Sequence, residues 1–160
     1  MSQLPESLIT ELSAWRQDGK SVDNLLDLDS WLGCNGNLSL AIGYSTIFWP
    51  EFVLFEDYIF RKSAAVETVR AFEAQSKGNK QSVEWVLNHI HITDIHFNEV
   101  NEAEDKVVFL GRKLKHIWEV KLRWQFPDRP CVVEFYQPED KKNLVEYQLS
   151  FWQKKHEIPK

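Results

Sequence analysis

Cysteine, glycine and long apolar runs are scarce in this sequence, and each scarcity excludes a class of protein. The two cysteines, Cys34 and Cys131, lie far apart and form no CxxC pair, so a disulfide framework, a cysteine zinc clip and a redox motif are not indicated. No stretch approaches the roughly 18 apolar residues of a membrane helix, and the N-terminus lacks the pattern of a signal peptide. We therefore expect a cytoplasmic protein with two reduced, buried thiols and no membrane association.

Recognised motifs of catalysis are also lacking. The six glycines are scattered and form no phosphate-binding loop. Neither Cys34 nor any serine lies in a nucleophile motif such as GxSxG. The acidic pair Glu56-Asp57 is explained more simply as a hairpin turn than as an acid-base pair. Catalysis has no positive support in the sequence, and we expect no cofactor.

The composition is that of an ordinary globular protein. With 160 residues, 43% of them hydrophobic and 27% charged, the chain is long enough to bury a core, and we expect one domain over residues 1–160. The aromatic share of 13%, with 7 Trp and 10 Phe, is high. So many large side chains must either fill the core or face a partner.

The formal net charge of -5 is unevenly distributed along the chain. Residues 1–60 hold nine acids and only two basic residues, Arg16 and Lys20. Binding of nucleic acid depends on clustered Lys and Arg, so this acidic third argues against a phosphate-binding surface. It fits a basic protein partner better.

Hydrophobic spacing and capping residues predict a series of helices. Residues 38–49 fit both a strand and a helix period, and we favour a helix capped by Asn37 and stopped by Pro50. A capping box of Asn101 and Glu104 begins a further helix that buries residues 107, 110, 114 and 117. The remaining helices are expected over about residues 5–18, 21–32, 64–75 and 80–88.

The C-terminal third alternates apolar and polar residues, as half-buried strands do. We predict three runs, residues 120–126, 131–137 and 144–152, in an antiparallel meander, with a hairpin near residues 51–62 that can extend the sheet. The fold class is therefore α+β, with about five or six helices. The predicted buried face of the meander consists of Leu122, Trp124, Val133, Phe135, Tyr147 and Leu149.

One histidine-rich segment invites a chemical interpretation. His89, His91, Asp94 and His96 carry the imidazole and carboxylate groups that bind zinc or iron. The segment follows a predicted helix, however, and a helix would place His89 and His91 about 200° apart. We therefore expect that these histidines do not converge on one metal ion.

Two regions could contact a partner protein. Asp23 and Asp27 project away from the stripe of Leu25, Leu28 and Leu32, and with Asp29 they give the second predicted helix an acidic face. The outer face of the predicted meander would expose residue types that dominate interface hot spots. The candidates on that face are Arg123, Tyr136 and Trp152, together with Lys121, Glu134 and Gln148.

Three functions remain open. The first is a non-catalytic protein-binding module, such as an immunity or antitoxin-type inhibitor of a basic partner. The second is a small-ligand or metal-dependent enzyme that uses the region of His89, His91, Asp94 and His96. The third is a structural subunit or a homodimer.

Overall fold

The computed structural model describes residues 6–17, 27–62, 64–96 and 103–157. Contacts between backbone positions divide the chain into two compact units, Met1–Ser45 and Thr46–Lys160, and we describe each unit by itself. The single domain expected over residues 1–160 stays a prediction.

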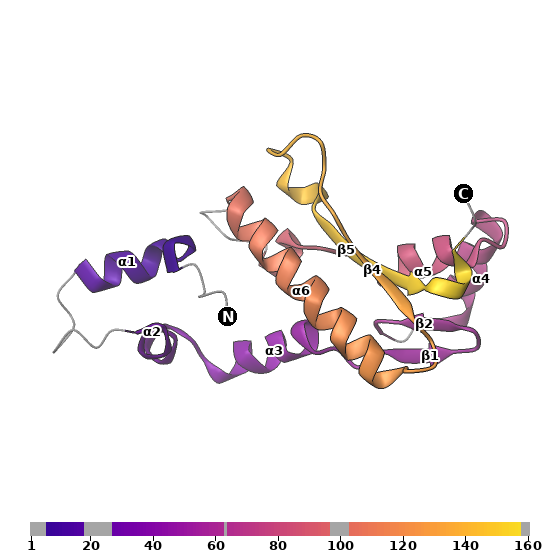
Figure 1. The fold of residues 1–160 in the computed structure, drawn as a ribbon, viewed down its shortest axis with the longest axis horizontal. Helices are drawn as coiled ribbons and strands as arrows, with labels where there is room; N and C mark the ends of the chain where they lie inside the picture. The colour runs from indigo at the N-terminus through magenta and orange to yellow at the C-terminus, as the bar shows by residue number, and fades with distance from the viewer. Residues whose placement is uncertain (1–5, 18–26, 63, 97–102, 158–160) are drawn as a thin grey trace. The chain divides into compact units, whose positions relative to one another are not determined.

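The N-terminal unit consists of short helices, as expected. A 3-10 turn η1 (Glu6–Leu8) leads into α1 (Thr10–Gln17), and α2 (Leu28–Asn35) and α3 (Leu38–Phe48) follow (Figure 1). Residues 46–48 at the end of α3 already belong to the C-terminal unit. Among the described residues of this unit, Leu12 alone is buried. The helices of this unit therefore have almost no apolar core of their own.

The ends of α2 and α3 are set by polar side chains. Asp27 accepts a hydrogen bond from the backbone N–H of Ser30 at 2.9 Å, so α2 begins several residues later than predicted, and the predicted start near Ser21 lies outside the described residues. Asn37 accepts the same kind of bond from Leu40 at 2.9 Å, which confirms the helical interpretation of residues 38–49.

The C-terminal unit combines helices with two antiparallel sheets, which confirms the α+β class. Strands β1 (Val53–Phe55) and β2 (Tyr58–Phe60) form the predicted hairpin as a sheet of their own, and β3 (Ile90–His91), β4 (Cys131–Tyr136) and β5 (Gln148–Gln153) form the second. The helices are α4 (Val66–Gln75), α5 (Lys80–Asn88) and α6 (Glu104–Gln125). Short 3-10 turns are η2 (Thr93–Ile95), η3 (Leu144–Glu146) and η4 (Lys154–His156).

The predicted meander is only partly correct. Strands β4 and β5 pair as expected, but residues 120–125 continue α6, and the third strand is β3, which pairs with the other edge of β5. The reason is that Leu114, Trp118 and Leu122 repeat every four residues and are all at most 2% exposed. Trp124, placed on the buried face by alternation, is 69% exposed. The hairpin β1–β2 does not extend the three-stranded sheet.

The core of the C-terminal unit lies between α6 and the three-stranded sheet. Helix α6 packs on β4 (Figure 1), and the Trp118 ring meets Phe151 edge to face at a centroid distance of 6.1 Å. Gly111 permits the close approach, because a Cβ there would lie 2.2 Å from the ring of Phe135. The predicted buried positions 107 and 114 are confirmed, while the predicted cap Asn101 lies outside the described residues.

Two buried polar side chains of α5 join β2 to β5. Glu84 accepts hydrogen bonds from the backbone N–H groups of Ile59 at 2.9 Å and Gln153 at 2.7 Å. One turn later, Asn88 donates to the carbonyl oxygens of Ile59 at 2.9 Å and Phe151 at 3.2 Å. These bonds satisfy backbone groups of β2 and of the part of β5 that the two-residue strand β3 does not pair with.

Candidate functional site

The N-terminal unit presents an exposed apolar surface. Helix α3 has eleven residues, none charged and none buried. Leu38 is 83% exposed, Ile42 69% and Leu40 45%, and Leu32 on α2 is 50% exposed. We call these four residues the apolar helix surface. On α3, Leu38 and Ile42 share one side and Leu40 lies on the opposite side, so the exposed apolar residues face more than one direction. Exposed apolar residues on helices with so little core of their own can be covered by a partner.

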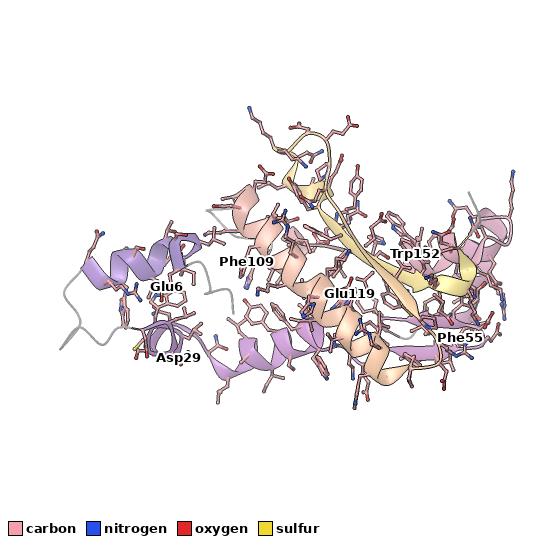
Figure 2. The ribbon with its side chains drawn as sticks, in the orientation of Figure 1. Glu6, Asp29, Phe55, Phe109, Glu119 and Trp152 are labelled. Atoms are coloured by element: carbon pink, nitrogen blue, oxygen red, sulfur yellow. The ribbon has the colours of Figure 1, made fainter. Side chains whose placement is uncertain are left out.

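Carboxylates on α2 accompany this surface. The hydrogen bond from the backbone N–H of Ser30 holds the pKa of Asp27 below its usual range, so Asp27 is ionised at neutral pH. Asp29 is exposed in the first turn of α2 (Figure 2). Arg16, a basic residue of this unit, forms an ion pair with Glu6 at 2.7 Å. Asp23, the third predicted partner-binding acid, lies outside the described residues.

The three partner-binding candidates of the C-terminal unit do not share one exposed face. Arg123 is exposed in the last turn of α6, and Tyr136 is 43% exposed at the end of β4. Trp152 lies within β5 (Figure 2), is only 7% exposed, and donates from Nε1 to Glu157 at 3.4 Å. Lys121, expected on the same face, is 5% exposed. The prediction that these residues share one outer face of the sheet is therefore wrong. A role of the individual residues in binding a partner stays a prediction.

A different aromatic cluster is exposed in its place. The rings of Trp49 and Trp124 lie 6.3 Å apart, and the Lys121 ammonium lies 5.2 Å from the first and 4.4 Å from the second. Both indoles are about half exposed or more, at 49% and 69%. The sequence did not predict this cluster, because its alternating pattern places Trp124 on a strand, facing inward.

Asp57 anchors the hairpin turn through a cluster of cations. It accepts hydrogen bonds from Lys155, from Lys80 at 2.8 Å and from His156 at 3.3 Å. Hydrogen bonds from Lys155 and then Lys80 hold the pKa of Asp57 far below its usual range. The cluster ties the hairpin to η4, so the interpretation of Glu56-Asp57 as a structural turn is confirmed.

The histidine segment does not continue the helix, contrary to the reasoning from the sequence. His89 follows the last residue of α5 in extended conformation and His91 lies in β3, so their rings come within 5.4 Å, centroid to centroid. Nδ1 of His89 lies 2.5 Å from the carbonyl oxygen of Val86, and Nδ1 of His91 lies 2.5 Å from that of Val145. A carbonyl accepts only from an N–H, so both rings carry the proton on Nδ1 and leave Nε2 as the acceptor.

His89, His91 and Asp94 line one cavity of about 220 Å³, while His96 lines a different cavity of about 160 Å³. In the part of the chain that the structure describes, no group of three or more His, Cys, Asp or Glu is arranged to hold a metal ion. The cavity of about 220 Å³ also contains a cationic side chain, Arg61, in its lining. The full lining is Ile47, Arg61, His89, Ile90, His91, Asp94 and Ile95.

Arg61 lines this cavity although no pattern in the sequence indicates it. Its backbone N–H donates to Asn88 at 2.8 Å, which fixes the residue where the chain leaves β2. Its buried Nε has no hydrogen-bond partner, and burial lowers the pKa of the guanidinium. Arginine nevertheless stays charged in proteins, so a cation lines this cavity.

The two cysteines are free, and only one of them is partly buried as expected. Burial raises the pKa of Cys131 to about 12, which keeps it a thiol at neutral pH. Cys34 is exposed, so the expectation that it is buried was wrong. The physical reason is that Cys34 lies on α2, a helix without a buried residue.

None of the helices that the structure describes is both long and apolar enough to cross a membrane. No protein-family model, curated protein or solved structure matches this chain.

Proposed function

We propose that this chain is a non-catalytic protein-binding module whose N-terminal unit docks onto a basic protein partner, as an immunity or antitoxin-type inhibitor does. The observation that carries the proposal is the apolar helix surface, Leu32, Leu38, Leu40 and Ile42, which is 45–83% exposed. Apolar residues at this exposure gain free energy when a partner removes them from water, by roughly 25 cal/mol per Å².

The small core of the N-terminal unit supports the same proposal. With only Leu12 buried among its described residues, this unit gains little from internal packing. Helices of eight to eleven residues are marginal in water by themselves, because their propensity does not offset the entropy of ordering the chain. A partner that covers α2 and α3 would supply the missing apolar contacts.

The charge of the partner follows from α2. Asp27 and Asp29 are exposed carboxylates at the start of α2, the helix that also carries Leu32 of the apolar helix surface, and a basic partner would be attracted by them during association. The two free thiols favour a reducing compartment, and we place the protein in the cytoplasm.

The first experiment is quantitative affinity purification from the native cell with three forms of the full chain. The test variant carries Leu38→Ser and Ile42→Ser, and the control carries Val145→Ser, because Val145 is a 59% exposed apolar residue of the other unit. We expect one basic protein in stoichiometric amount with the wild type and the control, and its loss from the test variant. Recovery of no stoichiometric partner, or its retention by the test variant, would refute the proposal.

The second experiment tests the acids by association kinetics with that partner. A triple variant, Asp23→Asn, Asp27→Asn and Asp29→Asn, removes three charges and keeps the cap of α2, because Asn and Asp cap helices about equally well. We expect slower association, most visibly at low salt, with nearly unchanged dissociation. An association rate independent of both the substitutions and the salt would leave the acids with a role in solubility alone.

A homodimer is the second candidate, because the apolar helix surface could equally be covered by a second copy. Sedimentation of the wild type and of the Leu38→Ser, Ile42→Ser variant distinguishes the two. A wild-type dimer that the variant converts to a monomer would identify the partner as this chain itself.

A further inference from the structure

We propose that the cavity lined by Arg61, His89, His91 and Asp94 binds a small aliphatic α-amino acid, with its carboxylate on Arg61 and its ammonium on Asp94. Its lining residues belong to the C-terminal unit, and one of them, Ile47, lies near the end of α3, whose earlier turns carry Leu38, Leu40 and Ile42. The proposal concerns a small ligand and does not rest on the proposed protein partner. Three observations carry it: the charges of the lining, the tautomers of the two histidines, and the size and apolar part of the cavity.

The lining holds two opposite charges that do not pair. Among the residues that the structure describes, neither Arg61 nor Asp94 forms an ion pair, with one another or with any other side chain, although both line the same cavity. The buried Nε–H of Arg61 has no acceptor, which is costly, and a carboxylate matches the planar fork of donors of a guanidinium. A ligand that carries both a carboxylate and an ammonium would satisfy both charges at once.

The two imidazoles add acceptors to the same wall. Nδ1 of each ring donates to a backbone carbonyl at 2.5 Å, so Nε2 is the nitrogen of each ring that can accept from a ligand. An ammonium has three N–H donors and no acceptor, so it matches a wall of carboxylate and imidazole acceptors. At neutral pH the charges of Arg61 and Asp94 cancel, which suits a ligand of zero net charge better than phosphate or a simple amine.

The remaining lining is aliphatic. Ile47, Ile90 and Ile95 contribute it, and the cavity volume is about 220 Å³. Pockets for drug-sized ligands have roughly 300–1,000 Å³, so this cavity fits something smaller. A branched aliphatic side chain on an amino acid would bury apolar surface against the three isoleucines. We therefore expect leucine, isoleucine and valine to be the ligands that bind.

The test is calorimetric titration of the full chain with L-leucine, L-isoleucine and L-valine at pH 7.5. Two analogues of leucine separate the charges: 4-methylpentanoate lacks the ammonium, and 3-methylbutylamine lacks the carboxylate. Inorganic phosphate tests for a simple anion site. We expect one amino acid bound per chain, with each analogue weaker by about tenfold or more, because a charge-assisted hydrogen bond contributes at least that factor.

Variants locate the ligand in this cavity. Arg61→Gln and Asp94→Asn should each weaken binding of the amino acid by about tenfold or more, while Arg112→Gln, the control, replaces an exposed arginine of α6 and should leave it unchanged. Asp94 is itself exposed at the rim, so Asp94→Asn should fold even if Arg61→Gln does not. Circular dichroism verifies the fold of each variant.

Four results would overturn the proposal. The first is no heat with any of the three amino acids up to about 10 mM. The second is phosphate or either analogue binding as tightly as the amino acid. The third is wild-type affinity in Asp94→Asn, which would mean that the ligand is recognised without the ammonium contact. The fourth is wild-type affinity in a folded Arg61→Gln variant.

Discussion

Glu84 is the one acid that is buried among the described residues, and its replacement by Gln tests how much its hydrogen bonds stabilise the C-terminal unit. The side chain is fully buried, and each carboxylate oxygen accepts two hydrogen bonds. Oε1 accepts from Ile59 N at 2.9 Å and from Gln153 Nε2 at 2.7 Å, and Oε2 accepts from Gln153 N at 2.7 Å and from His156 Nδ1 at 2.9 Å. Glu84→Gln turns one of these acceptors into a donor.

The magnitude follows from the donors that lose their acceptor. Whichever way the amide introduced by Glu84→Gln is oriented, its NH₂ group faces a backbone N–H, from either Ile59 or Gln153. His156 can adapt because its Nδ1 can accept a hydrogen bond when it carries no proton, while Nε2 still donates to Asp57, but a backbone N–H can only donate. One orphaned buried donor costs about 1–3 kcal/mol, and the remaining bonds weaken because they are no longer charge-assisted. We expect a loss of about 3 kcal/mol in the free energy of unfolding, a large share of the roughly 5–15 kcal/mol typical of a domain.

The assay is urea unfolding at pH 7, followed by far-ultraviolet circular dichroism. The matched control is Glu139→Gln, which removes an exposed carboxylate between β4 and β5 and should change the free energy of unfolding by less than about 0.5 kcal/mol. A loss below about 1 kcal/mol for Glu84→Gln would show that the four hydrogen bonds are not jointly required.

Three further perturbations give distinct expectations. Trp118 is fully buried, so Trp118→Ala should lower the free energy of unfolding in urea by about 3–5 kcal/mol. Trp124 is 69% exposed, so Trp124→Ala should lower it by about 1 kcal/mol. Equal losses would contradict the helical placement of both residues. The pKa of Asp57 is lower in the folded than in the unfolded chain, so its carboxylate stabilises the fold at pH values above its unfolded pKa near 3.9, and this stability is lost as the pH falls through the folded pKa. Asp57→Asn should therefore lower the urea midpoint at pH 7 and reduce the decline of that midpoint below about pH 4. If the urea midpoint of Asp57→Asn depended on pH as that of the wild type does, the stabilising role of the Asp57 cluster would be refuted. At pH 8 a thiol reagent should modify the exposed Cys34 rapidly, and it should modify Cys131, whose pKa is raised to about 12, only after unfolding. Labelling followed by mass spectrometry of peptides measures both rates. Equal rates in the folded protein would contradict the burial of Cys131.

Local signals in the sequence determined most of the secondary structure. The helix α5, the start of α6 near Glu104, the hairpin β1–β2 and the β4–β5 pair were all predicted from spacing and turn residues. The helical assignment of α3 depended on the cap at Asn37, which the structure confirms. Caps, turns and period involve residues within a few positions of one another, so a sequence alone contains them.

Residues 120–125 show where local signals end. Leu122 belongs both to an alternating run and to the four-residue repeat of Leu114 and Trp118, and each pattern is consistent with the sequence. The decision between strand and helix came from packing, because the sheet accepts the side of α6 that carries Trp118 and Leu122 and leaves Trp124 in solvent. The edge position beside β5 is taken by β3, whose two residues are too few for any alternation to reveal.

The charges and the cavity were decided only by tertiary structure. Glu84 is an ordinary polar residue of a helix in the sequence, and it is buried because donors from β2, β5 and η4 converge on it. Arg61 and His91 meet at one cavity because Asn88 fixes the chain after β2 and because β3 pairs with β5. Such convergence depends on contacts between residues far apart in the chain, and for these contacts the sequence has no local pattern.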